Sequence, residues 1–158
     1  RGLCDCQTYR WYYLMKVYHY TKESHLEKIL SDGFIQVDPT IPPIPGLVWL
    51  TSEKFIPNIC RPQDNTLTPA RFVDVGYYRF IFDSLNPLIK RWVSYQRTIQ
   101  GARESVATLH QMARSLIDNP KKWFVSEEPL PIEKHEEAAA DPEVNFLLDG
   151  QSINYFAP

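Results

Sequence analysis

The chain has 158 residues and a formal net charge of −2, with 17 Lys and Arg against 19 Asp and Glu. This length suits one domain with a hydrophobic core and is short for two. The balanced charge argues against a general electrostatic grip on nucleic acid. No run reaches the roughly 18 to 20 apolar residues of a membrane helix, so no membrane partner is predicted.

The cysteines indicate a reducing compartment. The chain has three cysteines, Cys4, Cys6 and Cys60, and an odd number this small does not make a disulfide framework. We therefore expect reduced thiols and a cytoplasmic location. The C-x-C pair has no matching second pair, so we predict no metal. Met15 is a plausible native start, which makes residues 1–14 either an N-terminal extension or an expression remnant.

The first elements form a strand, a helix and a stop. Residues 16–20 are rich in Val and Tyr and predict a strand. Thr21 or Ser24 is expected to cap the following helix, and Ser24 and Glu27 have the spacing of a capping box. Gly33 then supplies the left-handed residue that ends such a helix.

The middle of the chain predicts further strands and one long helix. Four prolines within residues 39–46 exclude a helix or a central strand there. Strands are predicted at 47–51, at 71–82 and at 122–127. Apolar residues with a period near 3.6 predict a helix over 98–118.

The domain organisation predicted from these elements is simple. Strands and helices mix without regular alternation, which favours an α+β fold over a doubly wound sheet. One domain is expected over 15–132. Residues 133–158 are expected to form a tail that packs on it, with an acidic, Ala-rich segment at 133–143 and a strand at 144–148.

Two strand ends carry groups suited to a ligand. His19 ends the first strand, and it is either an imidazole hydrogen-bonded in the interior or a contact for a ribose hydroxyl. In the second strand, alternation places Trp49 and Thr51 on one face and Leu50 and Ser52 on the other. Trp49 is thus either a core residue or the wall of a site for a flat ring.

The third strand ends in two carboxylates. Alternation puts Phe124, Ser126 and Glu128 on one face, with Val125 and Glu127 on the other. Either the acids are an exposed strand end before a proline, or one of them points into a cleft. A carboxylate set beside the neighbouring aromatic residues would be partly desolvated, which would raise its pKa.

Taken together, these segments resemble the ADP-ribosyltransferase superfamily. Members carry an ordered trio of strand-borne residues, commonly His, then Tyr or Ser-Thr-Ser, then Glu. The resemblance covers residues 16 to about 132. It rests on His19-Tyr20-Thr21, on Trp49-Leu50-Thr51-Ser52 and on Ser126-Glu127-Glu128-Pro129, with a first helix that ends in Asp32-Gly33-Phe34-Ile35.

The resemblance implies a split pair of small twisted sheets with flanking helices and with NAD, as substrate, in the cleft between them. His19 would contact the adenosine-side ribose, and Glu128, or else Glu127, would hold the nicotinamide ribose. The remaining NAD-binding positions would be Tyr20, Thr21, Trp49, Thr51 and Ser52. Two departures from the family pattern, Trp49 in place of Tyr and Ser126 two residues before Glu128, leave the acceptor undefined.

The function implied is an NAD-dependent ADP-ribosyltransferase, a toxin or a phage-encoded modifier, acting on a protein or a nucleic acid. One alternative in the same fold is an RNA 2′-phosphotransferase or an NAD glycohydrolase. Another alternative is a catalytically silent module that binds a nucleotide or a peptide. The oligomeric state is not predicted.

Overall fold

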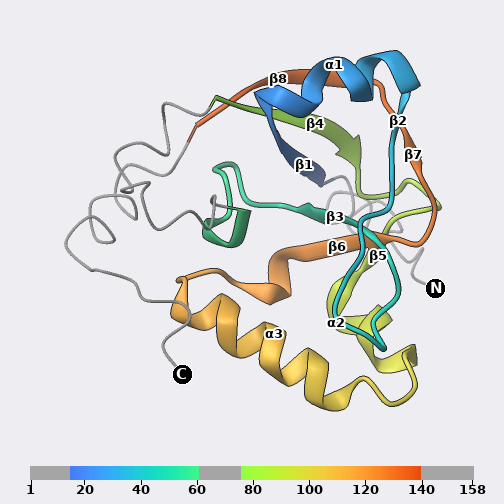
Figure 1. The fold of residues 1–158 in the computed structure, drawn as a ribbon, viewed down its shortest axis with the longest axis vertical. Coiled ribbons are helices and arrows are strands. Elements are labelled where there is room, and N and C mark those ends of the chain that lie inside the picture. The colour runs from blue at the N-terminus through green and yellow to red at the C-terminus, as the bar shows by residue number, and fades with distance from the viewer. Residues whose placement is uncertain (1–14, 61–75, 140–158) are drawn as a thin grey trace, which may run out of the picture.

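A computed structural model describes residues 15–60 and 76–139 of the chain (Figure 1). The predictions for 1–14, 71–75 and 144–148 lie outside these residues. The strands are β1 (Lys16–Lys22), β2 (Phe34–Ile35), β3 (Val48–Thr51), β4 (Tyr77–Asp83), β5 (Lys90–Arg91), β6 (Trp123–Ser126), β7 (Leu130–Pro131) and β8 (Lys134–Ala138). The α-helices are α1 (Glu23–Asp32), α2 (Trp92–Tyr95) and α3 (Arg103–Ser115), and short 3-10 helices lie at Asn58–Cys60, Gln96–Thr98 and Pro120–Lys122.

The strands form two sheets of unequal size. Six of them make a sheet in the order β5-β6-β3-β1-β4-β8, and the pairs in it are antiparallel. The short strands β2 and β7 pair separately. The predicted α+β class is therefore confirmed.

The large sheet has hydrophobic residues on both faces. One face carries Val17, Leu50 and Phe124, and α1 packs on it through Leu26 and Ile29. The other face is covered by α2 and α3. Its cluster comprises Ile44, Leu47, Trp92, Tyr95, Ala102, Ala113, Trp123 and Val125, with Trp49 packed against it. Figure 1 shows α1 and α3 on opposite sides of the sheet.

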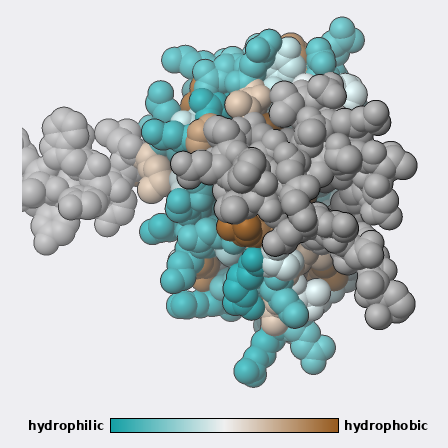
Figure 2. Space-filling model, turned by 90° about the vertical axis from the view of Figure 1, so that its left-hand side faces the viewer, coloured by the Kyte–Doolittle hydropathy of each residue, from teal (hydrophilic) through white to brown (hydrophobic). Residues whose placement is uncertain are grey.

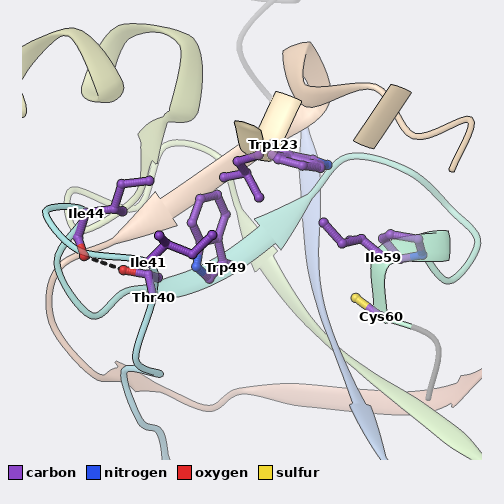
Figure 3. Close-up of a pocket in the computed structure, with 9 residues that line it drawn as sticks. Thr40, Ile41, Ile44, Trp49, Ile59, Cys60 and Trp123 are labelled. Atoms are coloured by element: carbon purple, nitrogen blue, oxygen red, sulfur yellow. Dashed lines mark hydrogen bonds between the residues drawn. The ribbon is translucent and has the colours of Figure 1, made fainter. Parts of the chain in front are cut away.

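The joint between β1 and β3 is short. Within the described strands, seven residue pairs join β1 to β4, and four join β3 to β6. Between β1 and β3 the register contains a single pair, Tyr18 opposite Thr51. In Figure 3 the blue strand β1 and the teal strand β3 meet at one end and separate in a V. The sheet thus consists of two three-stranded halves joined at one point.

The start of α1 differs from its prediction. Strand β1 continues to Lys22, which becomes the N-cap, and no side chain caps the helix. The predicted caps Thr21 and Ser24 are therefore wrong, because Thr21 is still part of the strand and Ser24 already lies inside the helix. The predicted stop is confirmed, since Gly33 has a φ of 74° and its N–H donates to the carbonyl of Ile29.

Two later elements also differ from the predictions. The helix predicted over 98–118 is shorter, because Gly101 adopts a φ of 70° and α3 begins only at Arg103. The acidic segment after Pro131 contains β8, which pairs with β4 and forms an edge of the large sheet. The part of the predicted tail that the structure describes is therefore a strand of the main sheet.

Among the residues coloured in Figure 2, hydrophilic ones dominate, and hydrophobic ones appear as small separate patches. Among the described helices, none has the length and apolar character needed to cross a membrane.

Candidate functional site

His19 lies where the two halves of the sheet separate. Its Nδ1 is 2.8 Å from the carbonyl oxygen of Trp49 on β3. A carbonyl only accepts hydrogen bonds, so Nδ1 carries the proton and donates it. The side chain therefore links β1 to β3. It does so one residue along β1 from Tyr18, which forms the single residue pair between the two strands.

The imidazole is held in its neutral form. Burial lowers the pKa of His19, while the hydrogen bond to Trp49 and the nearby charge of Asp38 act in the opposite direction. With Nδ1 protonated, a neutral ring offers Nε2 as an acceptor. Among the described residues none is recorded as a hydrogen-bond partner of Nε2, and His19 keeps some exposure. A hydroxyl group of a ligand can therefore donate to it.

The two residues that follow His19 point to opposite faces. Thr21 is buried on the same face as His19, as strand alternation requires. Tyr20 lies on the other face, where its hydroxyl donates to the carbonyl of Glu53 at 2.7 Å. Burial is the main cause that raises the pKa of Tyr20 to about 12. The hydrogen bond of Tyr20 therefore holds β1 to the segment after β3, which is a structural role.

The structure does not bring the Trp49 ring beside the His19 ring. Tyr18 and Thr51 are opposite each other and share a face, so Trp49 shares that face while His19 points to the opposite one. The indole of Trp49 packs at 4.7 Å from the ring of Trp92 and at 5.8 Å from that of Trp123. Only the carbonyl of Trp49 meets His19, so Trp49 does not form the aromatic wall expected next to the imidazole.

Thr51 and Ser52 lie at the end of β3 that is joined to β1, away from the end where the two strands separate. Thr51 is buried between Tyr18 and Trp123, and its hydroxyl accepts from the N–H of Glu53. The N–H of Ser52 donates to the carbonyl of Lys122 at 3.0 Å. Both residues thus stabilise a strand end, and the structure does not gather them with His19.

Glu127 is held by two neighbours. One carboxylate oxygen accepts from the hydroxyl of Tyr95, and the other contacts the Lys90 ammonium, both at 2.8 Å. The hydrogen bond from Lys90 is the main cause that lowers the pKa of Glu127, followed by that from Tyr95. A raised pKa was expected for a carboxylate here. For Glu127 that expectation is wrong, because the cation and the hydroxyl stabilise the charged form more than desolvation opposes it.

Glu128 is exposed, and its backbone is fixed by Ser126. The fully buried Ser126 hydroxyl donates to the carbonyl of Glu128 at 2.7 Å and accepts from its N–H at 3.2 Å. The predicted alternation holds within β6, because Phe124 packs on the α1 face while Val125 packs on the α3 face. The contact of Glu127 with Tyr95 places Glu127 on the α3 side.

Antiparallel pairing brings three of the predicted segments to one end of the sheet. Strand β1 runs opposite to β3, and β3 runs opposite to β6, with Val48 facing Ser126. The end of β1 after His19, the start of β3 and the two glutamates after β6 therefore lie at the open end of the V. His19 is level with Leu50 and Phe124, so Glu127 begins roughly 10 Å further along the strands.

A cavity of about 280 Å³ lies on the α3 face of the sheet (Figure 3). Trp49 and Trp123 contribute its aromatic wall, and Leu109 of α3 contributes another part. The other lining residues are Thr40, Ile41, Ile44, Pro57, Ile59 and Cys60. The cavity and the imidazole of His19 are thus on opposite faces of the sheet.

Three residues of this region were missed by sequence reasoning. Asp38 lies close enough to His19 to act on its charge, and Lys90 and Tyr95 hold Glu127. Lys90 belongs to a basic pair that is typical of solvated surface, and no sequence spacing connects any of the three with its partner. Among residues 15–60 and 76–139, no cluster of three His, Cys, Asp or Glu side chains is arranged to hold a metal ion.

Comparison of the chain with protein-family models, with curated proteins and with solved structures returned no match.

Proposed function

We propose that the protein is an NAD-dependent ADP-ribosyltransferase that binds NAD where β1 and β3 separate. The observation that carries the proposal is the opening of the sheet at His19, whose imidazole spans the gap with Nδ1 and keeps Nε2 for a ligand. This supports the split pair of small sheets that the resemblance implies. The free thiol of Cys60 is compatible with a cytoplasmic location.

The chemistry needs a fixed negative charge near the nicotinamide ribose. When the bond between C1′ and the nicotinamide nitrogen breaks, positive charge develops on the sugar, as in glycoside cleavage. A carboxylate beside the sugar stabilises this charge, and it also orients the 2′-hydroxyl. Nicotinamide leaves, and a nucleophile of the acceptor forms the new bond to C1′.

Of the two glutamates, Glu128 suits this role better. The carboxylate of Glu127 is already engaged by Tyr95 and Lys90 on the α3 side. Glu128 follows Ser126, which faces the same side of the sheet as His19, and its carboxylate has no recorded partner among the described residues. Its separation from His19 along the strands suits contacts with two different riboses of one dinucleotide.

The test is the release of nicotinamide from NAD by the purified protein, with and without cell lysate. We expect release that depends on lysate, and transfer of labelled ADP-ribose to a macromolecule in that lysate. Glu128→Gln is expected to lower the rate by a factor of about 100 to 1,000, the range found when one preorganised stabilising group is removed. Glu27→Gln on the exposed surface of α1 is the matched control and should keep the rate.

The other outcomes separate the alternatives. Release without lysate indicates an NAD glycohydrolase. Binding of NAD without any release indicates a silent nucleotide-binding module. A Glu128→Gln variant with full activity beside an inactive Glu127→Gln would reverse the assignment of the two carboxylates. His19→Ala should mainly weaken NAD affinity, and an unchanged affinity in calorimetry would contradict the role given to the imidazole.

A further inference from the structure

We propose that the cavity between the sheet and α3 is a binding site for a small, neutral, aromatic molecule, separate from the NAD site. The position of the cavity separates it from His19. The rings of Trp49 and Trp123 that line it point away from the face that carries His19. A ligand in the cavity and a ligand that contacts the His19 imidazole would therefore lie on different faces of one sheet.

The chemistry of the cavity wall suits a neutral ligand. Among the residues that the structure describes, those that line the cavity carry no charged side chain. The Thr40 hydroxyl is within hydrogen-bond distance of the carbonyls of Ile44 and Pro45, so its proton is already engaged. The Cys60 thiol is neutral, because burial raises its pKa to about 12. Phosphates and riboses would find few partners here, whereas a neutral apolar molecule loses little by leaving water.

The size and shape of the cavity suit an aromatic ring. An apolar cavity of roughly 150 Å³ is large enough to bind benzene, and this one measures about 280 Å³. The rings of Trp49 and Trp123 meet at 84°, so a third ring can stack on one of them and meet the edge of the other. Trp49 remains partly exposed although its neighbours Val48 and Leu50 are buried, which leaves ring surface for a ligand to cover.

The experiment is a calorimetric titration of the full chain with benzene, and with nicotinamide as a polar ring of similar size. We expect saturable binding of benzene and no displacement of it by nicotinamide or by NAD. Two variants fill the cavity from different elements, Leu109→Trp from α3 and Ile41→Trp from an exposed loop position. Each should weaken benzene binding at least about tenfold, and Leu85→Trp, at an exposed leucine outside the cavity, should not.

Ile41 is already exposed, so its replacement leaves the core intact and keeps the test valid if Leu109→Trp fails to fold. The proposal is overturned by an absence of saturable benzene binding to the unaltered chain. It is also overturned if both filled variants bind benzene as well as the unaltered chain does. Competitive displacement of benzene by nicotinamide or by NAD would show that the cavity belongs to the NAD site. None of these results depends on whether the protein transfers ADP-ribose.

Discussion

Lowering the pH should weaken the attachment of α3 to α2, because His110 on α3 accepts a hydrogen bond from Trp92 on α2. The indole N–H of Trp92 is 2.8 Å from Nε2 of His110, and the Trp92 side chain is fully buried. An imidazolium has no lone pair to accept this bond. Protonation of His110 therefore leaves a buried N–H without its partner.

The direction of the pH effect follows from the pKa of His110. Burial is the main cause that lowers this pKa below the ordinary value of 6.5, and the charge of Arg114 adds to it. Below about pH 6.5 the unfolded chain therefore binds more protons than the folded chain. The stabilisation is present above the unfolded pKa and is lost as the pH falls towards the folded one. His19 contributes with the same sign, since its pKa is also lowered.

The expected size comes from the hydrogen bond. A buried donor left without a partner costs about 1 to 3 kcal/mol. His110 is only partly buried and water can reach it, so we expect the lower part of that range, about 1 to 2 kcal/mol. The assay is urea unfolding at about pH 7, 6 and 5, the range in which histidine titrates. Within this range the carboxylates are largely ionised in both states.

The matched variant is His110→Gln, whose side-chain oxygen accepts a hydrogen bond but does not titrate. It should lose clearly less stability than the unaltered chain between pH 7 and pH 5. The stability that the variant still loses in this range should come from His19. If the variant loses as much as the unaltered chain, the reasoning about the Trp92 pair is refuted.

Three further predictions concern other positions. Gly33→Ala should lower the free energy of unfolding by about 1 to 2 kcal/mol, because the residue has a positive φ although its added Cβ would meet no atom within 4 Å; an unchanged urea midpoint would contradict this. Ser126→Ala removes both hydrogen bonds to the backbone of Glu128, so it should cost about 1 to 3 kcal/mol in the same assay and also slow nicotinamide release. With the other two cysteines replaced by serine, Cys60 should react with iodoacetamide far more slowly in the folded chain than in urea, since its pKa is raised to about 12, and equal rates would be the contrary result.

Local patterns predict local structure well in this chain. The alternation of Trp49 with Leu50, and of Phe124 with Val125, is observed on the two faces of the sheet. The helix stop at Gly33 is also observed, because a left-handed residue is strongly favoured to be glycine. These features depend on neighbours within a few residues, which is the information that a sequence pattern contains.

The relation between His19 and Trp49 could not be predicted in this way. Alternation states which residues of one strand share a face, but it does not state how two strands are aligned. A shift of one residue between β1 and β3 would move Trp49 to the other face relative to His19. The observed alignment of Tyr18 with Thr51 is a long-range property, so it became visible only in the structure.

Strand β8 was missed for a different reason. Its residues are Lys134, His135, Glu136, Glu137 and Ala138, which carry no alternation of apolar and polar side chains. Its backbone pairs with β4, and Arg79 forms an ion pair with Glu136 across the two strands. A strand stabilised mainly by its backbone and by charges leaves no hydrophobic signal in the sequence.

The position of β8 at the edge of the sheet affects how molecules of this protein meet one another. In the described strand order it is the last member on its side, and four of its five residues are exposed (Figure 1). Charged side chains along an outer strand disfavour the addition of a strand from another molecule. The acidic and basic residues of β8 should therefore protect this edge against aggregation when the protein is concentrated.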